Sequence, residues 1–256
     1  MTTSLYHVSV SAESQPGLVR EHNEDMLLID TDTYRDAGTC RNFDLDVADT
    51  LIITVADGLG GHNAGEVASA DALRELGAHV AALPSVLSSD ELHQDLTTWV
   101  RTEHEYLIQQ GIENPENIGM ATTLVATLFY RGRVYLINCG DSRLYLYNAG
   151  GLHQLSTDHS LFRITQDPQD RHVITNCIGA GDETYIDFED ITERLTQGCR
   201  LLLCSDGLTD MLSDEDIAAA LCDSAEAKDL VQSAYEAGAR DNVSVIVATI
   251  TDMAAK

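Results

Sequence analysis

The feature that most constrains this chain is the stretch Leu51–Gly65, LIITVADGLGGHNAG. It begins with an apolar, β-branched run, which is typical of a strand buried on both faces. The run ends at Asp57, which is followed by Gly58, Gly60 and Gly61. A carboxylate at the end of a buried strand costs free energy unless a partner compensates its charge, and glycines let the backbone approach a small ligand. The stretch therefore predicts either a tight Asp-Gly turn or a cation site.

Acids stand at strand boundaries along the whole chain. Two further apolar runs lead into Asp141 and Asp206, while Asp241 and the pair Glu24–Asp25 directly precede strand-like runs. One such acid indicates a turn, but several spread over the chain can converge at one end of a sheet assembly. The recurrence favours a carboxylate site, whose hard oxygen ligands suit Mg²⁺ or Mn²⁺ better than zinc.

Composition restricts the possible partners. The chain has 42 acidic residues against 15 Lys and Arg, a net charge of −27, which argues against nucleic acid and anionic membrane. No apolar run is long enough to span a bilayer, and the first residues lack a secretory signal, so we expect a cytoplasmic protein. Six scattered cysteines without a CxxC pair predict buried, reduced thiols.

The first half of the chain reads as strands followed by helices. A strand begins at Tyr6, and the run 26–30 after a Pro-Gly turn is predicted to be its partner. The polar segment 31–49 reads as a surface loop. Helical periodicity predicts helices over 64–82 and 88–111, the second starting with a Ser-x-x-Glu capping box.

The second half reads as antiparallel strands with one helix pair. Helices are predicted over 214–222 and 225–239. Strands are predicted over 122–131, 133–139, 143–148, 151–155, 185–191, 200–205 and 242–250. Without βαβ alternation, the pattern favours an antiparallel α+β fold, and without a linker it favours one domain.

Seven motifs, in this order, resemble the metal-dependent protein serine/threonine phosphatases of type 2C, in their bacterial form. They are Arg20-x-x-Asn23-Glu24-Asp25, Val55-Ala56-Asp57-Gly58-x-Gly60-Gly61-His62, Met120-Ala121-Thr122-Thr123, Gly140-Asp141-Ser142-Arg143, Thr157-Asp158-His159-Ser160, Cys204-Ser205-Asp206-Gly207-Leu208 and Asp241-Asn242-Val243-Ser244. The resemblance implies an α+β four-layer sandwich, two central antiparallel β-sheets flanked by pairs of helices, in a single domain over residues 5–251.

The resemblance also implies a metal centre. Asp57 would bridge two Mn²⁺ or Mg²⁺ ions, with the Gly58 carbonyl and waters completing the coordination. Asp25, Asp206 and Asp241 would hold the pair from either side.

Three further residues have implied roles with open alternatives. Glu24 would act through water. Arg20 would bind phosphoryl oxygens with its fork of donors, or form only a surface ion pair. Asp141 would hold a third ion, as in bacterial relatives, or cap a tight turn with Ser142.

The leaving-group acid is not evident. Where eukaryotic relatives carry a histidine, this chain has Leu59. His62 and Asn63 are candidates for capping the following helix. We expect His159 to be structural.

The implied function is hydrolysis of phosphoserine and phosphothreonine in proteins by a two-metal-activated water. The enzyme would be a monomer acting on phosphorylated proteins, opposing a bacterial kinase. Such hydrolysis is extremely slow without a catalyst, and one general acid supplies only about 10² to 10⁴ of acceleration, so electrostatic catalysis is needed. A two-metal nuclease is disfavoured by the charge. A non-catalytic phosphoprotein-binding regulator would be expected to lack one or more of the four principal acids, which are all present.

The segment 161–170 is shorter than the flap that bacterial relatives usually carry there. Pro168 disfavours a full helix in it. The shortening is either neutral loop variation or leaves the metal centre open, with weak binding of a third ion and poor discrimination between peptides.

Overall fold

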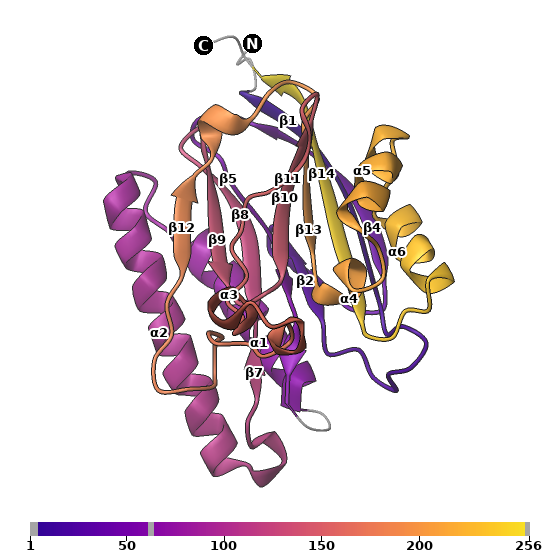
Figure 1. The fold of residues 1–256 in the computed structure, drawn as a ribbon. Coiled ribbons are helices and arrows are strands. Elements are labelled where there is room, and N and C mark those ends of the chain that lie inside the picture. The colour runs from indigo at the N-terminus through magenta and orange to yellow at the C-terminus, as the bar shows by residue number, and fades with distance from the viewer. Residues whose placement is uncertain (1–4, 61–63, 254–256) are drawn as a thin grey trace.

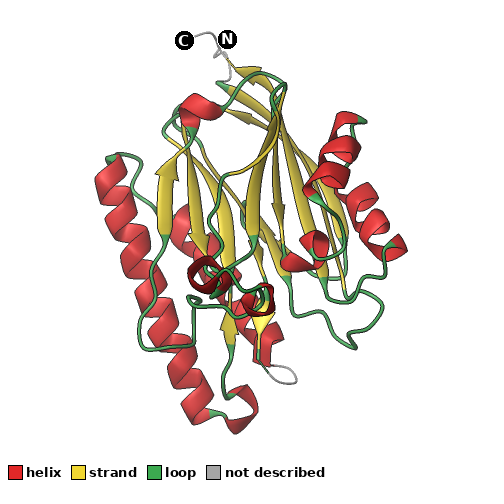
Figure 2. Cartoon of the chain, in the orientation of Figure 1, coloured by secondary structure: helices red, strands yellow, loops and turns green. Residues whose placement is uncertain are grey.

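The computed structural model describes residues 5–60 and 64–253, which form two stacked six-stranded antiparallel sheets (Figures 1 and 2). Across the first sheet the order is β11 (Gly151–Gln154), β10 (Arg143–Asn148), β13 (Arg200–Cys204), β14 (Val243–Met253), β1 (Tyr6–Gln15) and β4 (Gly38–Leu45). Across the second it is β12 (Asp187–Asp190), β9 (Arg133–Cys139), β8 (Leu124–Tyr130), β5 (Thr50–Ala56), β2 (Met26–Ile29) and β3 (Asp32–Tyr34).

Helix pairs cover the outer faces of both sheets, which confirms the predicted four layers (Figure 2). The second sheet packs against α1 (Ala64–Ala81) and α2 (Ser89–Glu113), and the first against α5 (Asp214–Cys222) and α6 (Ala227–Glu236). The capping box at the start of α2 is present, since Ser88 and Glu91 bond each other's backbone N–H groups. Among the described residues, no helix is both long and apolar enough to cross a bilayer.

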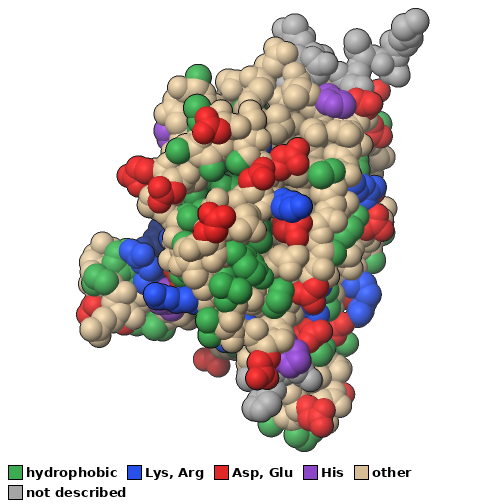
Figure 3. All heavy atoms as spheres, turned by 90° about the vertical axis from the view of Figure 1, so that its right-hand side faces the viewer, with side chains coloured by type: hydrophobic (Ala, Val, Ile, Leu, Met, Phe, Trp, Pro, Cys, Tyr) green, Lys and Arg blue, Asp and Glu red, His purple; other side chains and the backbone are tan. Residues whose placement is uncertain are grey.

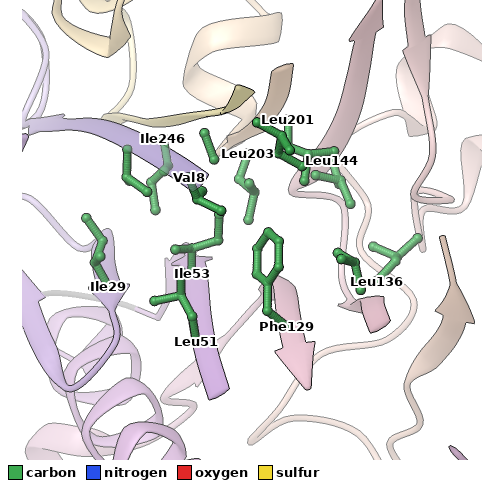
Figure 4. Packing of buried hydrophobic residues seen from close by; sticks show 14 of the residues in the cluster. Val8, Ile29, Leu51, Ile53, Phe129, Leu136, Leu144, Leu201, Leu203 and Ile246 are labelled. Carbon is green, nitrogen blue, oxygen red and sulfur yellow. The ribbon is translucent and has the colours of Figure 1, made fainter. Parts of the chain in front are cut away.

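The apolar core lies between the sheets. Ile53, Phe129, Leu201 and Leu203 are almost completely buried and point toward one another from both sheets (Figure 4). Because side chains alternate along a strand, Ile52 faces the opposite way, into the layer under α1 and α2. Both faces of β5 are thus covered, as its unbroken apolar run predicted. On the face of the molecule that Figure 3 shows, acidic side chains are scattered over the surface.

Three expectations about the fold were wrong. The segment 31–49 is not a loop, because it contains β3 and the whole of β4, whose exposed edge face gives it a polar sequence. The run 26–30 is not the partner of the first strand: β1 pairs with β14 and β4, while β2 lies in the other sheet. All six cysteines are free as predicted, but Cys40 and Cys222 are exposed.

Short helices and strands follow the main strands at the lower end of the sandwich in Figure 1. The two-stranded sheet of β6 (Gly58–Leu59) and β7 (Ala121–Thr122) follows Asp57, and α4 (Asp206–Thr209) follows β13. The flap segment contains only the single turn α3 (Phe162–Thr165) and the 3₁₀ turn η2 (Pro168–Asp170), in agreement with the prediction that no full helix forms there.

Candidate active site

Strand ends from both sheets converge on a pocket of about 440 Å³. Its lining includes seven of the eight predicted site residues: Arg20, Glu24, Asp57, Gly58, Asp141, Asp206 and Asp241. The eighth, Asp25, is fully buried and close enough to raise the pKa of Asp57 by charge repulsion. Acids far apart in the sequence therefore lie together.

Asp57 is fixed by the strand beside it. Its backbone N–H donates to the Thr123 hydroxyl at 3.0 Å, and its carbonyl accepts from the Thr123 N–H at 2.8 Å and from the Thr122 hydroxyl at 3.0 Å. The Thr123 hydroxyl in turn bonds that of Ser142 at 2.7 Å. These threonines stand in a motif noted in the sequence, but their part in holding Asp57 was not foreseen.

Gly58 is needed for close approach of three chain segments. A Cβ atom there would lie 2.2 Å from the carbonyl oxygen of Gly65 and 2.5 Å from that of Glu24. Both are backbone atoms, so no side chain can be accommodated without moving them. The glycine after Asp57 thus brings the strand end, the start of α1 and the Glu24 segment together.

Asp25 has one carboxylate oxygen without a partner. Its Oδ2 accepts a hydrogen bond from the Ser205 hydroxyl at 2.7 Å, whereas its fully buried Oδ1 has none. A buried carboxylate oxygen that lacks a donor costs free energy, and a cation would compensate it. This orphaned oxygen, surrounded by other carboxylates, fits a site for a hard divalent cation.

The electrostatics of the pocket point the same way. Burial raises the pKa of Asp25 and Asp141 to about 7 and that of Asp206 to about 6, and repulsion between neighbouring acids adds to the effect. Burial and repulsion also raise the pKa of Asp57 well above its ordinary value. The carboxylates therefore lack sufficient positive charge from the protein itself.

Arg20 reaches the pocket from its edge. Its Nη2 donates to Asp241 Oδ2 at 2.7 Å, and about half of its side chain is exposed. This hydrogen bond raises the pKa of Arg20. The ion pair that the sequence analysis gave as an alternative role of Arg20 does form. It holds the guanidinium at the pocket mouth, where the other N–H donors can bind a ligand.

Asn242 orients the segment next to the pocket. Its Oδ1 accepts from the Glu24 N–H at 2.8 Å, and its amide donates to the carbonyls of Pro16 and His22, both at 2.9 Å. In the sequence analysis Asn242 appears only as part of a motif.

Two pocket residues were missed altogether. His172, which follows the flap turns, lies 3.9 Å from Asp206 and 3.6 Å from Asp210, measured between Nδ1 and a carboxylate oxygen. Ligand atoms of these three residues lie within 4.8 Å of one another. Asp210 follows Asp206 by one helical turn, a spacing visible in the sequence, whereas nothing local singles out His172.

The residues considered in the search for a leaving-group acid lie in different places. His159 is buried outside the pocket lining, where its Nδ1 accepts from the Gly140 N–H at 3.1 Å and its Nε2 lies 3.1 Å from Asp187, so it is structural. Leu59 lines the pocket. His62 and Asn63 lie outside the described residues.

Comparison with known proteins agrees with the fold. The family model of protein phosphatase 2C matches residues 34–240. The serine/threonine phosphatase stp of Listeria welshimeri is 32% identical over 250 residues, covering 90% of this chain and 91% of that protein. The Streptococcus agalactiae serine/threonine phosphatase structure superposes with a TM-score of 0.80 at 27% identity, covering 94% and 98% of the two chains.

A further solved structure bears on the metal. The catalytic domain of the phosphatase PstP in complex with two manganese ions has a TM-score of 0.74 and 33% identity to this chain, covering 96% of it and 100% of that domain. The four-layer fold with its acid-lined pocket is that of a metal-dependent phosphatase. The chain belongs to the protein phosphatase 2C family.

Proposed function

We propose that this chain is a Mn²⁺- or Mg²⁺-dependent phosphatase that hydrolyses phosphoserine and phosphothreonine in proteins. The observation that carries the proposal is the convergence of Asp25, Asp57, Asp206 and Asp241 at one pocket, with Asp25 Oδ1 unpaired. The alternative, a non-catalytic phosphoprotein-binding regulator, is disfavoured because every principal acid is in place and the relatives named above are phosphatases.

The residues divide into those that hold metal and those that meet substrate. For the metal we assign the carboxylates of Asp25, Asp57, Asp206 and Asp241, the Gly58 carbonyl, Glu24 through water, and Asp141 for a third ion. When bound, such ions activate a water as nucleophile and stabilise charge on the phosphoryl group. Arg20, held at the pocket mouth by Asp241, binds the phosphoryl oxygens with its remaining N–H donors.

The proposal includes a biological setting for the activity. The enzyme acts in the cytoplasm, as a monomer with one catalytic domain over residues 5–251, on phosphoproteins produced by a cognate Ser/Thr kinase, or on that kinase itself. Its net charge of −27 supports a protein substrate over a polynucleotide, because phosphodiester chains are repelled by an acidic surface.

The test is release of phosphate from a phosphothreonine peptide. We expect turnover that requires Mn²⁺, is lost on adding a chelator and returns with excess metal. An autophosphorylated bacterial Ser/Thr kinase domain serves as the protein substrate. Turnover that survives the chelator would contradict metal dependence, and no turnover with Mn²⁺ would favour the regulator.

A further inference from the structure

Arg35 and Asp36 lie where the chain passes from one sheet to the other. They stand between β3, in the second sheet, and β4, in the first. Asp36 has a φ of 52°, in the left-handed region that non-glycine residues seldom adopt. This corner belongs to the segment 31–49, to which sequence analysis gave no chemistry.

Arg35 joins Asp25 to the start of α1. Its Nε donates to the Asp25 carbonyl at 2.9 Å and its Nη1 to Glu66 Oε1 at 2.9 Å. Its Nη2 donates to the Glu66 carbonyl at 2.8 Å and to the Ser69 hydroxyl at 2.9 Å. Only 15% of the side chain is exposed. A buried guanidinium with four such bonds holds its partners in one fixed geometry.

Ser69 extends the connection to the preceding residue. Its buried hydroxyl donates to the Glu24 carbonyl at 2.5 Å while accepting from Arg35. The consecutive carbonyls of Glu24 and Asp25 are thus both tied to the first turns of α1. The same Glu24 carbonyl packs against Gly58.

Asp36 holds the opposite side of the same segment. Its Oδ1 accepts from the Asn23 amide at 3.0 Å. Asn23 also donates to the Ser14 hydroxyl at 2.9 Å, and its Oδ1 accepts the Asp25 N–H at 3.1 Å. The pair Arg35–Asp36 therefore acts on Asp25 from both sides, directly at its carbonyl and through Asn23 at its N–H.

We propose that Arg35 and Asp36 are positioning residues that preorganise Asp25 for divalent cation binding, an inference that rests on the proposed function. Asp25 is pressed among like charges with one oxygen unpaired, so a loosely held backbone would relax away from the pocket. Mutating a residue that orients a metal ligand from outside the coordination shell typically lowers metal affinity or activity about 10- to 100-fold.

The first experiment measures Mn²⁺ binding directly by isothermal titration calorimetry. We expect Arg35→Met to raise the Mn²⁺ dissociation constant by about tenfold or more. Arg35→Lys, which keeps the charge but not the fork, should fall between Arg35→Met and wild type. The matched control is Arg74→Met, because Arg74 is an exposed arginine of α1 whose ion pair with Asp71 has no contact with residues 23–25. It should bind Mn²⁺ within about twofold of wild type.

Asp36 offers an independent pair of variants. Asp36→Asn keeps an acceptor for Asn23 and tolerates the left-handed backbone, so it should bind Mn²⁺ like wild type. Asp36→Gly keeps the backbone but removes the acceptor, and should weaken Mn²⁺ binding several-fold. If Arg35→Met does not fold, this pair decides the question. Turnover of Asp36→Gly at saturating Mn²⁺ should return close to the wild-type value, since the metal then restores the geometry.

Two outcomes overturn the inference. The first is a lower melting temperature of the metal-free Arg35→Met or Asp36→Gly protein with an unchanged Mn²⁺ dissociation constant. This result would show that Arg35 and Asp36 stabilise the fold but do not position Asp25 for the metal. Failure of the wild-type protein itself to bind Mn²⁺ would overturn the proposed function as well, so the two failures are distinguishable.

Discussion

β5 and β13 end in the same short sequence, an apolar run followed by Asp-Gly, yet the two strand ends are built differently. Asp57 follows β5 in the second sheet, and its backbone N–H and carbonyl are both held by Thr123 of the neighbouring chain segment. Asp206 follows β13 in the first sheet and begins α4, so its carbonyl accepts from the Asp210 N–H at 2.8 Å.

The difference places Asp57 at the centre of the acid cluster and Asp206 at its rim. The pKa of Asp57 is raised well above its usual range by burial and by the charges of Asp25, Asp206, Asp141 and Asp241. The pKa of Asp206 rises only to about 6, and the nearby His172 opposes the rise. The same local pattern, an apolar run before Asp-Gly, therefore produced two aspartates whose pKa values are raised by different amounts, because the surrounding segments differ.

The largest expected effect is on activity. We expect Asp57→Asn to lower turnover of a phosphothreonine peptide by at least about 10³-fold, since a metal centre supplies several kcal/mol of charge stabilisation. Asp206→Asn should lose less, and excess Mn²⁺ should recover part of the loss. Circular dichroism checks that both variants fold. Equal losses that excess metal does not relieve would break the distinction between centre and rim.

The glycines after the two acids should matter for stability. A Cβ on Gly58 would meet the carbonyls of Gly65 and Glu24, and one on Gly207 would lie 1.9 Å from the Asn242 carbonyl. We expect Gly58→Ala and Gly207→Ala each to lower the free energy of unfolding by about 1–3 kcal/mol or more. Gly150→Ala, where only side-chain tips lie near, should change it by less than about 0.5 kcal/mol. Urea unfolding measures all three, and a tolerated alanine after either acid would show that its strand end can relax.

Asp25 lies against both strand ends, and its raised pKa makes the stability of the metal-free protein depend on pH. Its pKa of about 7 in the folded, metal-free protein exceeds the ordinary value of 3.8. Between these values the folded state binds more protons than the unfolded state, so the stability from this group falls as pH rises. In chelator, Asp25→Asn should therefore melt several degrees above wild type at pH 8, with a smaller difference at pH 5.

Metal should narrow that difference. Mn²⁺ at a hundredfold excess over its Kd adds about 2.7 kcal/mol to wild-type stability, and less to the weaker-binding Asp25→Asn variant. Differential scanning fluorimetry at both pH values, with Mn²⁺ and with chelator, gives the four comparisons. An Asp25→Asn effect that is the same at pH 5 and pH 8 would contradict the raised pKa of Asp25, which burial and, to a smaller extent, charge repulsion produce.

The smallest expected effect concerns the flap on the Asp206 side of the pocket. His172 and Ile174, which directly follow the flap segment 161–170, line the pocket, so the flap ends beside the chemistry. With so little chain over the site, we expect turnover to vary by less than about tenfold among phosphopeptides with different flanking residues, because each peptide contact is worth only about 1 kcal/mol. A steady-state panel measures this, and a strong preference for one flanking sequence would overturn it.

The elements predicted well are those with a local cause. The helix 214–222 has the predicted bounds, and the helix starting at Ser88 carries its capping box, because periodicity and caps are properties of adjacent residues. The acids at strand ends were equally visible, since an apolar run that stops at Asp-Gly is a local event. Gathering them at one pocket was foreseen only through their recurrence and the family resemblance.

The sequence by itself determined most of the strands, the capping box of α2 and the acids at the strand ends, because each is written in neighbouring residues. Only the tertiary structure decided that the first strand pairs with the last, that β3 and β4 belong to different sheets, and that Arg35 and His172 approach the site. Strand pairing depends on contacts between residues far apart in the chain. A single arginine in a polar segment carries no local sign that its guanidinium will meet the backbone of Asp25 once the two sheets have packed.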